Sequence, residues 1–91
     1  MVSVVVVHSW DDSQKEQVMD FANRVMTMAK EKKLPSGLKL ISIDLGENKN
    51  MAVCHWEVDS LDHLMQVASS LKPTWKIDAF VAKNVYKKGL F

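Results

Sequence analysis

The chain has 91 residues, of which 47% are hydrophobic, and its formal net charge is +1. This length predicts one domain over residues 1–91, and the balance of charge excludes the basic signature of a nucleic-acid partner. The opening valine run is too short to span a membrane and has no leader-like basic segment, and a single cysteine excludes an internal disulfide, so we expect a cytoplasmic protein with no membrane partner.

The first third of the chain predicts a strand followed by a long helix. Residues 2–9 contain four consecutive valines, which suit a strand that is covered on both faces. Ser13 and Glu16 have the spacing of a capping box, so we expect a helix to begin directly after Ser13. Apolar side chains then recur at helical spacing, and the helix should end near Lys33, ahead of Pro35.

Two strands joined by a tight turn are predicted over residues 38–45 and 51–58, because their side chains alternate and the loop between them has turn composition. The apolar face of the first of these strands consists of Ile41, Ile43 and Leu45. Pairing the apolar faces of both strands leaves His55 on the other face, beside Ser42 and Asp44. A slip of one residue would reverse the facing of His55, and the loop sequence leaves that register open.

A second helix and a last strand complete the predicted elements. Asp59 or Ser60 caps the helix, Pro73 closes it, and the strand runs from about Trp75 to Val85. The order is βαββαβ, which predicts an α+β ferredoxin-like plait: a four-stranded antiparallel sheet with two helices on one face. Right-handed crossovers place the first and third strands side by side at the sheet centre, where we expect them to be parallel.

The face of the sheet opposite the helices is predicted to need a partner. Valines of the first strand point to that face in either register. An exposed apolar sheet face usually indicates an interaction site. We therefore expect a homodimer with two sheets face to face around a barrel-like interior.

The pattern resembles the dimeric α/β-barrel superfamily over nearly the whole chain. The resemblance is carried by the strand ending in His8-Ser9-Trp10, the long first helix, the Leu-Pro-Ser-Gly-Leu segment before the second strand, and the C-terminal strand with its tail. It is strongest to small stand-alone members of unassigned function and more remote to antibiotic-biosynthesis monooxygenase and stress-responsive domains. It implies a dimer and a small-molecule pocket that lies between the sheet and the helices or in the barrel interior, but it carries over no catalytic residue.

Two histidines are the candidates for chemistry. His8 and His55 lie near the ends of strands expected to be neighbours, and with Ser42 and Asp78 they are the candidate ligand-binding residues of the dimer-facing surface. An apolar cavity with a few polar groups is typical of a ligand pocket. A histidine near a strand end is more often structural. Cys54 should face away from His55, so we expect no metal site, and no cofactor motif is present.

The preferred interpretation is a homodimer that binds a small apolar ligand in the barrel interior, with the tail 85–91 packing on the partner protomer. One alternative is a cofactor-independent monooxygenase-like or isomerase-like enzyme acting on an aromatic or polyketide-like compound, with His8 or His55 as general base. The other is a purely structural dimerisation module with a packed interior. His63 falls on the solvent side of its helix and is left outside the site.

Overall fold

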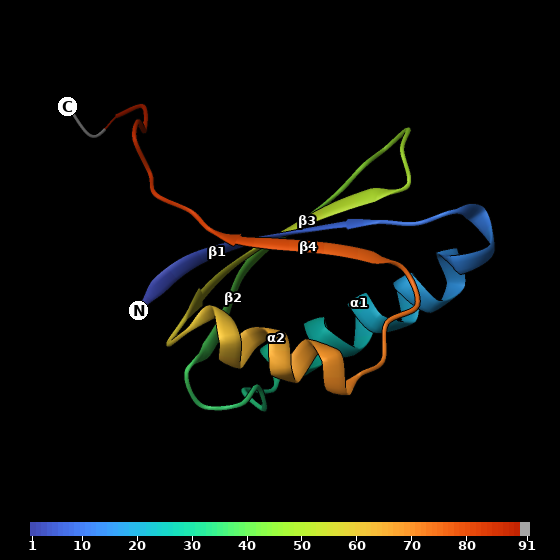
Figure 1. Cartoon of the computed structure of the whole chain (residues 1–91), viewed down its shortest axis with the longest axis horizontal. Helices are drawn as coiled ribbons and strands as arrows, with labels where there is room; N and C mark the ends of the chain where they lie inside the picture. The colour runs from blue at the N-terminus through green and yellow to red at the C-terminus, as the bar shows by residue number, and fades with distance from the viewer. Residues whose placement is uncertain (90–91) are drawn as a thin grey trace.

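The elements follow the predicted order in the computed structural model, which describes residues 1–89. The strands are β1 (Val2–Ser9), β2 (Leu38–Leu45), β3 (Met51–Val58) and β4 (Lys76–Val81), and the helices are α1 (Lys15–Lys30) and α2 (Leu61–Ser70). Both helices lie on one face of a single sheet (Figure 1). The predicted α+β ferredoxin-like plait is therefore confirmed.

The sheet has the order β2-β3-β1-β4, and every neighbouring pair is antiparallel. The prediction that β1 and β3 are neighbours is confirmed, but the prediction that they are parallel is wrong. The α1 crossover makes β2 parallel to β1, and the hairpin then reverses the chain, so β3 must run against β1. As a result His8 pairs with Ala52, whereas His55 pairs with Val5.

A β-bulge interrupts the alternation of β2. Leu40 pairs with Trp56 and the next pairing joins Ser42 to His55, so Ile41 is an extra residue. The bulge moves Leu40 to the face that the helices cover and leaves Ile41 52% exposed. The prediction that Ile41 belongs to the covered apolar face is therefore wrong, whereas the preferred register of Ser42 with His55 is confirmed.

The N-terminus of the first helix is capped two residues earlier than predicted. Asp11 caps a 3₁₀ turn, η1 (Asp12–Gln14), that leads into α1. The Asp11 carboxylate accepts a hydrogen bond from the Ser13 N–H at 3.1 Å, and the Gln14 side chain accepts one from the Asp11 N–H at 3.1 Å. The predicted capping box of Ser13 with Glu16 is therefore wrong, because the aspartate takes that role with Gln14.

The other boundaries lie close to their predicted positions. Ser60 caps α2, and its hydroxyl oxygen accepts a hydrogen bond from the His63 N–H at 3.1 Å. α1 ends at Lys30, a few residues before the predicted stop, and Lys32 then adopts a left-handed φ of 57°. The N–H of the following Lys33 bonds back to the helix, as in a Schellman motif.

The last strand is shorter than predicted. It ends at Val81, and only one further backbone bond, from the Ala82 N–H to the Ser3 carbonyl, continues the pairing. The segment that follows leaves the sheet, as Figure 1 shows, and Val85 and Tyr86 are 87% and 71% exposed. The remaining tail residues, 90–91, lie outside the described residues. Packing of the tail on a partner stays a prediction.

The core lies between the sheet and the helices. Its larger cluster consists of Val4, Val6, Val25, Leu38, Cys54, Trp56, Val58 and Leu64. A second cluster, near the beginning of α1, consists of Trp10, Val18, Ala52 and Trp75. All three tryptophans are buried. No layer covers the opposite face of the sheet within residues 1–89, and we call that face the open face.

Candidate functional site

An apolar cavity of about 80 Å³ lies between the two helices and the sheet. Its walls come from α1, α2 and the covered face of the sheet. The lining residues are Val6, His8, Val18, Phe21, Ala22, Val25, Met28, Leu34, Leu38, Ile43, Ala52, Cys54, Trp56, Leu64, Met65, Val67, Ala68, Leu71, Trp75 and Ile77. Apart from the imidazole, the two indoles and the thiol, these side chains are purely hydrocarbon or thioether. The cavity is therefore suited to an apolar occupant.

The size of the cavity limits what it admits. An engineered apolar cavity of about 150 Å³ holds benzene, and pockets for drug-sized molecules are several times larger still. A space of about 80 Å³ is about half that volume, so a ligand of about six heavy atoms enters only when side chains of the lining move. A polyketide-like compound is too large for this space.

His8 is the most polar side chain of the lining and is 7% exposed. It faces the helices because it continues the alternation of Val4 and Val6 along β1. Its Nδ1 accepts a hydrogen bond from Nε1 of Trp75 at 3.0 Å. An indole N–H only donates, so Nδ1 carries no proton. The neutral imidazole must therefore carry its proton on Nε2.

Nε2 of His8 makes no hydrogen bond to any described residue. In residues 1–89, the one completely enclosed side-chain nitrogen or oxygen without a partner is Nε1 of Trp10. Nε2 of His8 is thus unpartnered but keeps some accessible surface. The residue presents a free N–H donor in an apolar environment.

Two aromatic rings hold the imidazole in place. Phe21 of α1 and Trp75 meet edge to face, with ring centroids 5.1 Å apart at 81°. The centroid of the His8 ring lies 6.2 Å from that of Phe21 and 6.3 Å from that of Trp75. The loop that carries Trp75 is tied to the start of α1, because the Gln14 amide donates to the Thr74 carbonyl at 2.7 Å. The donor to Nδ1 is therefore positioned by several elements.

The electrostatics of the cavity keep it uncharged. Burial lowers the pKa of His8, and protonation of Nδ1 would also break the bond from Trp75. Burial raises the pKa of Cys54 to about 11, and the negative charge of Asp44 adds to this effect. Cys54 is therefore a neutral thiol, as expected for a buried cysteine, and has no thiolate character.

The other predicted site residues lie on the open face. His55 is exposed and lies between Ser42 of β2 and Val5 of β1. Asp78 of β4 pairs with Val7, so β1 separates it from His55. These three polar residues share a face, as the preferred register predicts.

His8 and His55 do not meet. They lie on opposite faces of the sheet and at different levels, because β1 and β3 are antiparallel. An arrangement in which both imidazoles line one end of a cavity therefore does not occur. Only His8, of the four candidate residues, lines the cavity between the helices and the sheet.

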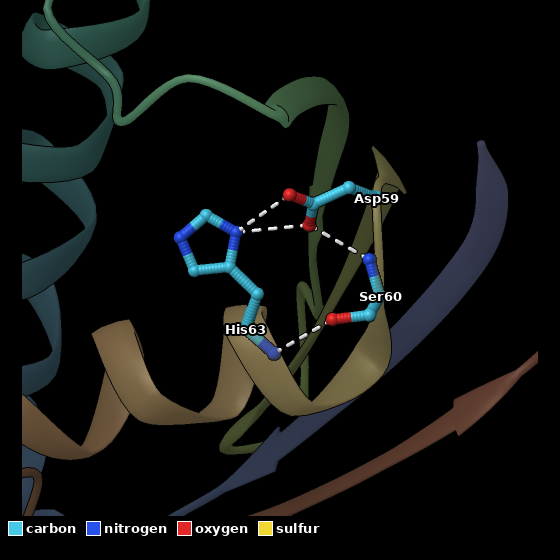
Figure 2. A network of polar contacts seen from close by, with 3 residues as sticks. All are labelled: Asp59, Ser60 and His63. Carbon is cyan, nitrogen blue, oxygen red and sulfur yellow. Dashed lines mark hydrogen bonds and ion pairs between the residues drawn. The ribbon is translucent and has the colours of Figure 1, made fainter.

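A third polar cluster joins the end of β3 to α2, and Figure 2 shows it in close view. Nδ1 of His63 lies 2.9 and 3.0 Å from the two carboxylate oxygens of Asp59. The same carboxylate accepts a hydrogen bond from the Ser60 N–H at 2.7 Å. The hydrogen bond with His63 lowers the pKa of Asp59. His63 is partly exposed and lies outside the cavity, so this cluster belongs to the helix cap.

The sequence predicted His8 as a candidate but missed its partners. Trp75 appears in the sequence only as the start of the last strand, and Phe21 only as one of the apolar residues at helical spacing. The alternation of β1 places His8 on the same face as Val4 and Val6. Because valines occupy both faces of β1, the sequence alone did not show that the helices cover this face, and the prediction that His8 lies on the dimer-facing surface is wrong. The contact with Trp75 depends on tertiary packing that no local pattern encodes.

No family model, no curated protein and no solved structure matches this chain. The resemblance to the dimeric α/β-barrel superfamily therefore stays a prediction. Within residues 1–89, no helix combines the length and apolar character needed to cross a membrane. The same residues hold no group of three or more His, Cys, Asp or Glu side chains arranged to bind a metal ion.

Proposed function

We propose that this domain binds a small apolar ligand in the cavity between α1, α2 and the sheet. The observation that carries the proposal is an apolar space of about 80 Å³ whose lining includes one buried histidine, His8, with no hydrogen-bond partner at Nε2 among the described residues. Apolar cavities stay free of water and take up apolar molecules. The ligand proposed here would lie on the helix side of the sheet, whereas the sequence favoured the interior between two sheets.

Flexible side chains support entry into the cavity. Met28 and Met65, one from each helix, line it and are only half-buried. The unbranched thioether side chain adapts to irregular space and is common at apolar binding surfaces. Such side chains can adjust their shape to a ligand that the cavity takes up.

An enzymatic role receives less support from the geometry. The free nitrogen of His8 carries a proton in the neutral ring, so it does not act as a general base in this state. His55 is exposed on the open face and does not line the cavity between the helices and the sheet. A binding domain is therefore the better-supported proposal.

Binding can be tested with methylenecyclopentane, an apolar probe of six carbon atoms, titrated into the freshly purified protein. We expect shifts in the methyl NMR signals of cavity residues and a higher unfolding temperature, because a ligand that binds only the folded state stabilises it. Native mass spectrometry of the same sample reports any ligand that co-purifies.

A matched pair of variants locates the probe. Ala22→Leu adds a side chain to the cavity lining and should abolish the shifts. Ala29→Leu places the same change at another half-buried position of α1, outside the lining, and should leave them intact. Probe-induced shifts that are absent in the wild type, or that survive Ala22→Leu, would rule out the cavity as the binding site.

We also propose that two copies associate through the open face. Val5, Val7 and Val53 form its apolar centre, and Phe80 beside them is 48% exposed. Polar side chains, including Ser42, His55 and Asp78, surround these residues. An apolar centre with a polar rim is the usual composition of a protein interface.

Light scattering coupled to size exclusion tests this association, and we expect the mass of a dimer. Val7→Lys puts a charge at the centre of the open face and should yield monomers. Val81→Lys is the control, because Val81 is 53% exposed but pairs with Val4 on the helix side. A wild-type protein that runs as a monomer at high concentration contradicts the dimer and leaves the cavity proposal untouched.

A further inference from the structure

We infer that the ligand of the cavity is a small neutral carbonyl compound, such as a ketone, ester or amide, whose oxygen accepts a hydrogen bond from Nε2 of His8. The inference rests on the proposed function of the cavity and adds the chemistry of what it binds. His8 supplies the recognition, and Trp75 is a positioning residue that acts through it.

The imidazole of His8 is held in one tautomer. Trp75 donates to Nδ1 at 3.0 Å, and because an indole is never an acceptor this bond exists only with the proton of His8 on Nε2. The tautomer of His8 is thus fixed by the indole of Trp75, which can only donate a hydrogen bond. His8 offers a donor at Nε2 and has no free acceptor.

Nε2 of His8 needs a hydrogen-bond acceptor. His8 is 93% buried, lines the cavity, and has no partner at Nε2 among the described residues. A donor left unpaired in an apolar environment carries a desolvation penalty, which a ligand oxygen would remove. A purely hydrocarbon ligand would leave that penalty in place.

The lining of the cavity favours a ligand without charge. The lining contains no cation that would balance a carboxylate, and the nearby Cys54 is a neutral thiol. His8 would have to break its bond with Trp75 to become cationic. A neutral acceptor satisfies the donor without burying an unpaired charge, so a carbonyl is favoured over an acid.

The experiment compares two probes of nearly identical shape on the intact protein. Cyclopentanone has a C=O group where methylenecyclopentane has C=CH₂. We expect cyclopentanone to bind about tenfold more tightly, as one added hydrogen bond to a buried donor implies. ¹⁵N NMR of the imidazole should show the Nε2–H tautomer and a shift of that resonance with cyclopentanone alone.

Two variants separate the roles of the pair. His8→Phe keeps an aromatic ring in the cavity but removes the donor, so both probes should bind with equal affinity. Trp75→Phe removes only the indole N–H. It should give a mixture of the two neutral tautomers in the ¹⁵N spectrum and reduce the preference for cyclopentanone to about two- or threefold.

The outcomes distinguish the inference from the proposal beneath it. Equal affinity of the wild type for both probes overturns the carbonyl preference, while the cavity proposal stands. Failure of both probes to bind overturns the proposed function and the inference with it. An imidazole protonated on Nδ1 in the wild-type spectrum overturns the inference whatever the affinities, because the donor would then be absent.

Discussion

At the scale of single residues, His8 shows how one hydrogen bond decides what a buried histidine can do. A free imidazole chooses between two tautomers and titrates near neutrality. Burial favours the neutral form of His8, and the N–H of Trp75 then selects the proton position. The same contact removes a general base from the cavity and supplies a donor.

The pH dependence of stability should report this state. Because burial lowers the folded-state pKa of His8 below its ordinary value of 6.5, the unfolded chain takes up the proton first as the pH falls. His8 is neutral in both states well above 6.5, and below it the free energy of unfolding falls by up to about 1.4 kcal/mol per pH unit until the folded-state pKa is passed. The aromatic and aliphatic groups around it, Phe21, Ala52, Trp75 and Ile77, carry no charge.

Urea unfolding of the wild type and of His8→Phe between about pH 7.5 and pH 5 measures this effect. We expect a steeper loss of stability in the wild type, and the difference between the two curves isolates His8 because His55 and His63 are present in both. Asp59 does not interfere, because its lowered pKa affects stability only below its ordinary value of 3.8. Parallel curves would mean that His8 has the same proton affinity in both states.

At the scale of the elements, the sequence predicted types and order better than ends and facing. The strands over residues 38–45 and 51–58 have the predicted bounds, because alternation and turn chemistry are local. The cap at Asp11 and the bulge at Ile41 were missed. Each depends on a choice between adjacent residues that tertiary contacts decide, so propensity alone does not settle it. The antiparallel direction of β1 and β3 follows from connectivity, because the hairpin after β2 reverses the chain.

The junction between β2 and α2 depends on one glycine. Gly37 has a φ of +90°, and its carbonyl accepts a hydrogen bond from the Asp59 N–H at 2.9 Å. A Cβ at this position would lie 2.3 Å from Oδ2 of Asp59, the residue that also contacts His63. The glycine therefore permits both the turn and the close approach of the helix cap.

We expect Gly37→Ala to lower the free energy of unfolding by about 1–3 kcal/mol, because the alanine is strained at that φ and meets the Asp59 side chain. Gly89→Ala is the matched control. Gly89 also has a positive φ, of +93°, but nothing lies within 4 Å of the position of its Cβ. Chemical denaturation of both variants against the wild type measures the effect, and equal stability of the two would contradict the role of the junction.

At the scale of the whole molecule, the sheet separates two kinds of surface. The covered face contains the buried core and the cavity, and the open face contains three valines among polar side chains. The sequence predicted that both faces of β1 are apolar. It therefore predicted a partner protomer that covers the face opposite the helices. The periodicity of the sequence did not predict the cavity, because a void is a mismatch of side-chain volumes across three elements and leaves no periodic signal.

The cavity lowers the free energy of unfolding by an amount that matters for a domain of this size. At about 24 cal/mol per Å³, a void of about 80 Å³ lowers stability by about 2 kcal/mol, a substantial part of the margin of a small domain.

Ala68→Leu on α2 adds three carbon atoms to the lining and should recover up to about 1 kcal/mol in urea unfolding. The same variant should lose binding of methylenecyclopentane and cyclopentanone. Stability gained as binding is lost is the pattern expected when a void is kept for a ligand. If Ala68→Leu is less stable than the wild type, the space is too small to accept three carbons and the helices are already in contact across it.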